Sequence, residues 1–136
     1  MLAVVDSGPL YAVTDVDDED HERSLAALQR ADLQLVIPAL VVAEVTYIVG
    51  RRLGPQAEAS FLRGLEHLEV EAPAAEDWPR IAELVEAYQD FPLGGTDASV
   101  VALTERLRTE VVVTLDRRHF GAVQPRHCTA FRLLPE

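Results

Sequence analysis

Short continuous apolar runs alternate along the chain with longer segments that have the periodicity of a helix. The apolar runs predict buried strands, and they cover residues 2–5, 33–37, 68–72, 110–115 and 130–134. Apolar positions at helical spacing predict helices over residues 8–14, 22–30, 39–53, 56–65, 77–88 and 97–107. Strands that alternate with helices favour an α/β fold in which helices cover both faces of a parallel sheet. Because the chain has no internal repeat, linker or low-complexity tract, we expect residues 1–136 to form a single domain.

Two of the predicted helices carry specific expectations about burial. In the second one, Leu25 and Leu28 are expected on the face that packs inward. Segment 39–53 is apolar on nearly every face, and Gly54 and Pro55 end it. A helix of that composition is expected to be buried on most sides.

The composition narrows the class of protein. The chain has 136 residues, of which 49% are hydrophobic, and its formal net charge is -11. These values favour one compact domain over disorder, and they argue against a protein that coats nucleic acid through bulk charge. All 12 basic residues are arginine, so chemistry that needs a P-loop, Schiff-base or general-base lysine is excluded. The single cysteine, Cys128, excludes a disulfide scaffold and offers no zinc-site spacing.

No segment of the sequence predicts export or insertion into a membrane. The apolar N-terminus contains Asp6 and lacks a basic leading region, which is unlike a secretory signal. The longest apolar stretch, 36–49, is interrupted by Glu44 and is too short to span a bilayer. We therefore expect a soluble protein of the cytoplasm with no membrane partner.

Four acidic residues are candidates for a shared site. Asp6 and Asp116 follow predicted strands, where the carboxyl ends of a parallel sheet form the usual ligand-binding edge. Asp97 follows Thr96 at the start of a predicted helix. Each of these three could instead cap the helix that follows it. Glu44 is different, because it lies inside the apolar helix 39–53, where a buried carboxylate would need a cation or a strong partner. An ion pair with Arg51 or Arg52 is the alternative, although neither is three or four residues from Glu44.

Four carboxylates at one edge of a sheet would repel one another strongly unless a cation lay between them. Magnesium prefers oxygen ligands and keeps several waters, so carboxylates together with a substrate phosphate suit it. Mg²⁺, or Mn²⁺ in its place, could activate water and hold the oxygens of a phosphodiester. The residues therefore point to phosphodiester hydrolysis.

Four short motifs in this order and spacing resemble the PIN-domain nucleases, and within them the VapC-type toxins of toxin–antitoxin modules. The motifs are Val-Val-Asp-Ser-Gly-Pro at 4–9, Ile-Pro-Ala-Leu-Val-Val-Ala-Glu at 37–44, Pro-Leu-Gly-Gly-Thr-Asp-Ala-Ser at 92–99 and Val-Thr-Leu-Asp-Arg-Arg-His-Phe at 113–120. The resemblance covers essentially the whole chain and implies a five-stranded parallel sheet. It also implies an Mg²⁺- or Mn²⁺-dependent endoribonuclease that acts on RNA, forms a homodimer and pairs with a VapB-type antitoxin.

The same resemblance assigns residues to roles. It places the catalytic and metal-binding acids at Asp6, Glu44, Asp97 and Asp116, and a supporting hydroxyl at Thr114. Three further residues are expected around these acids, either in support of a ligand or in contact with substrate. They are Ser7, Arg117 and Arg118.

Purely structural roles remain open for several of these residues. Ser7 could cap its helix, and Arg117 and Arg118 could be solvated surface arginines. Arg51 and Arg52 are interpreted as charges at the C-terminal end of their helix, and His119 as a surface or loop-packing residue.

Two alternatives to a toxin remain open from the sequence. One is a PIN-fold nuclease that processes RNA outside a toxin system. The other is a non-catalytic domain that binds a protein partner, although such a domain would have no need to gather unpaired carboxylates.

Overall fold

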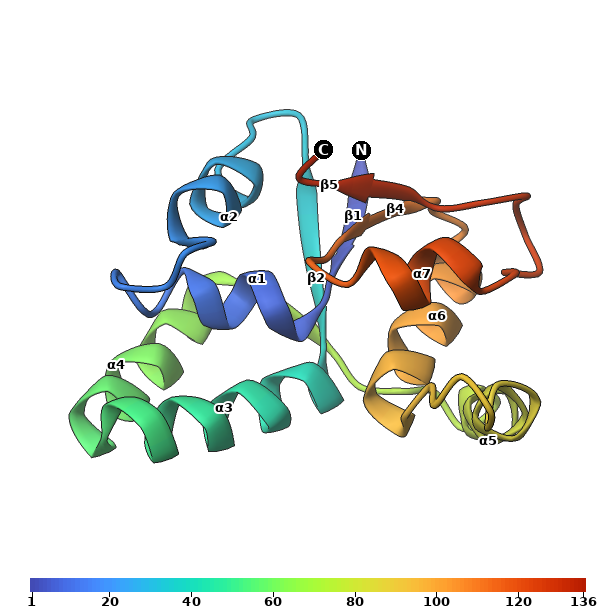
Figure 1. Ribbon diagram of the computed structural model, residues 1–136, viewed down its shortest axis with the longest axis horizontal. Helices are drawn as coiled ribbons and strands as arrows, with labels where there is room; N and C mark the ends of the chain where they lie inside the picture. The colour runs from blue at the N-terminus through green and yellow to red at the C-terminus, as the bar shows by residue number, and fades with distance from the viewer.

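The computed structural model describes residues 1–136 and places five strands in one sheet, in the order β3-β2-β1-β4-β5 (Figure 1). Every neighbouring pair of strands is parallel, which confirms the predicted α/β fold. The strands are β1 (Leu2–Val5), β2 (Gln34–Pro38), β3 (Glu69–Glu71), β4 (Val111–Val113) and β5 (Arg132–Leu134).

Helices lie on both sides of the sheet, as expected, with α1 to α4 on one side and α5 to α7 on the other in Figure 1. They are α1 (Ser7–Ala12), α2 (His21–Leu28), α3 (Ala39–Leu53), α4 (Pro55–Gly64), α5 (Asp77–Ala87), α6 (Gly95–Leu107) and α7 (Arg117–Ala122), with a 3-10 turn at Leu65–His67. None of these helices combines the length and the apolar character that crossing a bilayer requires.

The strand order contains one reversal, and it lies at the centre of the sheet. The chain runs from β1 outward through β2 to β3, and then returns to β4 on the other side of β1. The crevice beyond the carboxyl ends of β1 and β4 is therefore the topological switch point, where open parallel sheets bind their ligands. Asp6 follows β1 directly, and Asp116 lies three residues after the end of β4.

The boundaries around β4 differ from the prediction. The strand was expected to continue to Leu115 but ends at Val113. A short helix that was not predicted, α7, follows Asp116. This helix has a single buried apolar side chain, Phe120, and Asp116 caps it by accepting a hydrogen bond from the backbone N–H of His119 at 2.9 Å. Tertiary packing and a cap therefore stabilise a segment too short for a periodic pattern.

The burial of the helices corrects two expectations. The fully buried residues of α2 are Ser24 and Ala27; the two leucines expected on the inward face are partly buried, and of these Leu28 packs against the hydrophobic core as expected. Helix α3 buries one narrow stripe, made of Val41, Val45 and Val49, and is not buried on most sides. Val42 and Ile48 are partly buried against the core, whereas Tyr47 and Leu53 are exposed. Helix α6 is the most buried helix, with every residue from 98 to 104 enclosed.

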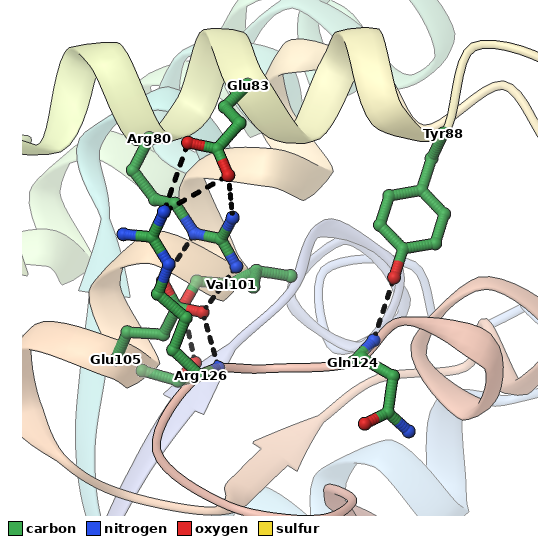
Figure 2. Close-up of polar contacts among 8 residues, drawn as sticks. Arg80, Glu83, Tyr88, Val101, Glu105, Gln124 and Arg126 are labelled. Atoms are coloured by element: carbon green, nitrogen blue, oxygen red, sulfur yellow. Dashed lines mark hydrogen bonds and ion pairs between the residues drawn. The ribbon is translucent and has the colours of Figure 1, made fainter.

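A network of ion pairs joins α5, α6 and the segment that leads to β5 (Figure 2). Arg80 on α5 donates two hydrogen bonds of 2.9 Å to the Glu105 carboxylate on α6 and one to Glu83. Arg126 donates to Glu83 through its guanidinium, and its backbone N–H donates to Glu105. The hydroxyl of Tyr88 accepts a hydrogen bond from the backbone N–H of Gln124 at 3.0 Å. These contacts hold the segment that leads to β5 against α5 and α6.

Candidate active site

Asp6 is the most deeply enclosed of the four candidate acids, with 4% of its surface exposed. Its Oδ2 accepts a hydrogen bond of 2.7 Å from the hydroxyl of Thr114, and its Oδ1 is buried without any partner. Burial raises the pKa of the Asp6 carboxyl to about 6, although hydrogen bonds from Thr114 and the Ser7 backbone oppose the shift. The negative charges of Asp97 and Asp116 raise this pKa further.

Asp97 lies in the first turn of α6 and is partly buried. Burial is the main cause that raises its pKa, followed by the charges of Asp116 and Glu44, whereas His119 lowers it. The four acids are therefore close enough to act on one another electrostatically. None of them forms an ion pair with an arginine, so no arginine relieves their mutual repulsion.

The structure corrects the reasoning that singled out Glu44. We expected this residue to be buried in an apolar helix, but its side chain is exposed, because it lies off the valine stripe of α3. Its carboxylate accepts a hydrogen bond from the hydroxyl of Ser7 at the start of α1. Ser7 therefore orients Glu44 toward the carboxyl edge of the sheet. The expected burial was wrong, and Glu44 remains a candidate because its charge acts on Asp97.

Asp116 is held by His119, a residue whose place the sequence did not reveal. The Oδ2 atom of Asp116 lies 2.8 Å from the ring Nδ1 of His119, and the ring Nε2 lies 2.7 Å from the carbonyl oxygen of Phe91. Because carbonyl and carboxylate oxygens only accept, both contacts need a ring N–H, so Nε2 donates a hydrogen bond to Phe91 and Nδ1 donates one to Asp116. Sequence reasoning treated His119 as a surface or loop residue. The Asp-x-x-His spacing after a strand was the signal that could have found it.

Thr114 connects the two aspartates at the switch point. While its hydroxyl donates to Asp6, the same oxygen accepts a hydrogen bond of 2.9 Å from the backbone N–H of Asp116. One buried side chain thus orients a carboxylate after β1 and the backbone after β4.

The two adjacent arginines of α7 have different environments. The guanidinium of Arg117 donates to the carbonyl oxygens of Pro135 at 2.6 Å and Leu133 at 3.5 Å. Arg117 therefore ties α7 to the C-terminal strand. The sequence predicted a contact with a substrate phosphate for this residue. The guanidinium carbon of Arg118 lies 5.0 Å from the centre of the Phe91 ring, and this side chain has no carboxylate partner. Neither arginine is paired with a carboxylate, but part of the Arg117 guanidinium is occupied by the two carbonyl oxygens.

The donors at this site suit a hard cation better than a soft one. All of them are carboxylate or hydroxyl oxygens, and the unpartnered Oδ1 of Asp6 is a ready ligand. No group of three or more aspartate, glutamate, histidine or cysteine side chains is spaced to surround one ion. The oxygen donors present fit Mg²⁺, which prefers oxygen ligands, keeps several waters and is bound through one or two carboxylates.

Comparison with known proteins identifies the family. The model of the PIN domain matches residues 3–124. Ribonuclease VapC26 of Mycobacterium tuberculosis is 35% identical to the chain over 134 residues, which is 97% of this chain and 99% of that protein. This chain belongs to the VapC family of PIN-domain proteins.

Solved structures share the fold of this PIN domain at lower sequence identity. VapC20 of Mycobacterium tuberculosis, described as a Sarcin-Ricin loop cleaving toxin, superposes with a TM-score of 0.80 at 17% identity and covers 88% of this chain and 94% of its own. VapBC2 from Rickettsia felis, bound to a DNA fragment from the promoter, gives a TM-score of 0.72 at 15% identity and covers 98% of both chains. These likenesses agree with the sheet order and helix placement described above.

Replacing Thr114 by valine in this PIN domain is expected to lower the free energy of unfolding by about 2 kcal/mol at pH 8. The change keeps the shape of a side chain that is 1% exposed but leaves the Asp6 carboxylate and the Asp116 backbone N–H without their shared partner. Urea unfolding measures the effect. Thr114→Ser keeps the hydroxyl and is the control. Equal unfolding midpoints for the two variants would contradict the role given to the hydroxyl.

Proposed function

We propose that this PIN-domain protein is an endoribonuclease that depends on Mg²⁺ or Mn²⁺ and acts as the toxin of a toxin–antitoxin pair. The observation that carries the proposal is the cluster of Asp6, Glu44, Asp97 and Asp116 at the switch point, none of them neutralised by an arginine. An assembly of mutually repelling carboxylates weakens the fold unless it serves to bind a cation. The name of its relative, Ribonuclease VapC26, supports the same activity.

Different parts of the chain position the four acidic side chains. Asp6, positioned by Thr114, and Asp97 at the start of α6 are the residues that would hold the ion most directly. Asp116 is oriented by His119, and Glu44 by Ser7. A bound Mg²⁺ would supply a positive charge for the phosphodiester oxygens and lower the pKa of a coordinated water. The protein's part is to hold the carboxylates in place.

The charge of the chain shapes the choice of substrate. Because the net charge is -11, the surface repels RNA at long range, and attraction must come from the ion and from nearby arginines such as Arg118. We therefore propose a selective ribonuclease that recognises the shape of its target. The description of VapC20 makes the sarcin–ricin loop one RNA to test.

The proposed partners follow from the family. VapBC2 from Rickettsia felis supports a VapB-type antitoxin, and we propose that the pair acts in the cytoplasm, where the RNA lies. We also propose a homodimer. Trp78 on α5 and Val70 on the edge strand β3 are 51% and 40% exposed, and apolar side chains of this kind are commonly covered at an interface.

Cleavage of an end-labelled panel of tRNAs and ribosomal stem-loops, in Mg²⁺, Mn²⁺ or chelator, tests the activity. We expect discrete cuts with either ion, none with chelator and none with Asp97→Asn. Asp90→Asn removes the same charge from an exposed loop residue and should cut like the wild type. Cuts that persist in chelator or in Asp97→Asn, or no cutting of any RNA by the wild type, would contradict the proposal. Growth arrest on expression of the wild type, but not of Asp97→Asn, tests the toxin role.

A further inference from the structure

A hollow of about 340 Å³ opens beside the acidic residues, between α1 and α3. Ser7 and Glu44 line one end of it, and Tyr11, Ile48 and Arg52 line the part farther from the sheet. Glu44, Ile48 and Arg52 are four residues apart along α3, so they share one face of the helix. From Glu44 to Arg52 the helix axis advances about 12 Å. The hollow therefore leads from the acidic cluster to an arginine.

Arg52 is not engaged by an acidic side chain. Its guanidinium carbon lies 5.1 Å from the centre of the Tyr11 ring, and no carboxylate pairs with it. The ring is itself fixed, because Tyr11 is 6% exposed and its hydroxyl donates to Asp15 at 2.9 Å. The aromatic ring thus holds the cation in place, and no carboxylate occupies the guanidinium. Burial raises the pKa of the Tyr11 hydroxyl, whereas the charge of Arg52 lowers it. By contrast, Arg80 and Arg106 are bound to carboxylates.

A second pair of the same kind lies across the acidic cluster. Arg118 on α7 stacks on Phe91, and Phe91 accepts the hydrogen bond of His119, the residue that holds Asp116. Figure 1 shows that α3 leads away from the carboxyl end of β2 on one side of the sheet, whereas α7 lies on the other. Two arginines without carboxylate partners, each on an aromatic ring, therefore flank the acids.

We infer that Arg52 and Tyr11 form a phosphate-binding subsite for the RNA strand on the α3 side of the acidic cluster. This inference rests on the proposed ribonuclease activity. A strand that crosses the acids would place one phosphate at the ion and another, from a neighbouring nucleotide, at Arg52. The guanidinium then donates to two oxygens of that phosphate, a strong charge-assisted geometry. Because Glu44 and Asp18 also line the hollow, the attraction for a phosphate there must come from Arg52 itself.

The experiment compares Arg52→Ala with Arg51→Ala, using the RNA that the wild type cuts most strongly in the panel of tRNAs and stem-loops. Arg51 is the neighbouring residue on the same helix, is exposed, and lies outside the hollow, so both variants lose one positive charge. We expect Arg52→Ala to raise KM about tenfold with kcat nearly unchanged, and Arg51→Ala to change KM less than twofold. Arg52→Lys should recover part of the loss, because it keeps the charge without the planar stack.

The salt dependence of RNA binding gives a second readout, measured in the Asp97→Asn background so that the RNA stays intact. Arg52→Ala should reduce the slope of log Kd against log salt by about 0.7, the loss of one phosphate contact with a single strand, and Arg51→Ala should not. A purely structural role for Arg52 would leave that slope unchanged. Equal KM values and slopes for the two variants, or weaker antitoxin binding with unchanged RNA binding, would overturn the subsite alone. A wild type that cuts no RNA would overturn the proposed function and the subsite together.

Discussion

Replacing Asp6 by asparagine is expected to reduce metal-dependent RNA cleavage by a factor on the order of a thousand. Asparagine has the shape of aspartate, and its carbonyl oxygen can still accept the hydrogen bond from Thr114. What the variant lacks is the negative charge on the oxygen that is buried without a partner. Because that oxygen is the best-placed ligand for an ion, the loss should fall on ion binding, and only through it on cleavage.

Two measurements separate this loss from a folding defect. Isothermal titration with Mn²⁺ should show weaker binding to Asp6→Asn, and urea unfolding at pH 8 without metal should show a variant at least as stable as the wild type. Asp17→Asn, a change at an exposed acid in the loop before α2, should match the wild type in cleavage and in Mn²⁺ binding. Full cleavage by Asp6→Asn, or Mn²⁺ binding equal to that of the wild type, would refute the ligand role of Asp6.

Residues that mark the ends of helices and strands made part of the fold predictable from the sequence. Helix α3 begins and ends where the sequence predicted, at Ala39 and Leu53, because Pro38 precedes it and a glycine and a proline follow it. The strand β1 also matches its prediction, since a continuous run of apolar residues ends at a turn. Such signals lie within a few residues of the boundary that they define.

The site was predictable to the extent that topology determines it. Residues after parallel strands meet at one edge of a sheet, so Asp6 and Thr114 are in contact although they are far apart in the sequence. The side-chain environment was not predictable in this way. Glu44 was expected to be buried because its neighbours are apolar, but composition does not reveal which stripe of a helix packs inward.

Long-range partners account for what sequence reasoning missed. The contact of His119 with the carbonyl of Phe91 and the pairing of Arg80 with Glu105 each join segments that only the folded chain brings together. The same holds for Arg52, which was interpreted as a charge at the end of its helix and which in the structure stacks on Tyr11 from α1. A charged side chain tells little about its role until its neighbours are known.

The stability of the metal-free protein is expected to fall as the pH rises from about 4 to above 6. The Asp6 carboxyl has a pKa of about 6 in the fold, against 3.8 for the ordinary group. Below pH 3.8 the carboxyl is protonated in both the folded and the unfolded chain, so it makes no difference. Between these two pKa values the Asp6 carboxyl is ionised in the unfolded chain but still protonated in the folded chain. The free energy of unfolding therefore falls as the pH rises through this range.

Above pH 6 the carboxyl is ionised in both states, and the full penalty remains, amounting to about 3 kcal/mol. The raised pKa of Asp97 acts in the same direction, whereas the lowered pKa of Glu105 acts in the opposite one. The contribution of Asp6 is therefore isolated by subtraction. Urea unfolding of the wild type and of Asp6→Asn is measured in chelator at pH 4, 5, 6, 7 and 8.

The difference between the two proteins is expected to be small at pH 4 and to grow in favour of Asp6→Asn until about pH 7, beyond which it stays constant. Adding Mg²⁺ at pH 8 should raise the free energy of unfolding of the wild type, because an ion that binds only the folded chain shifts the equilibrium toward it. The same addition should raise that of Asp6→Asn only slightly. A difference that is independent of pH would show that the carboxyl titrates alike in both states. The strain attributed to the acidic cluster would then be absent, and with it the physical reason for expecting an ion among these residues.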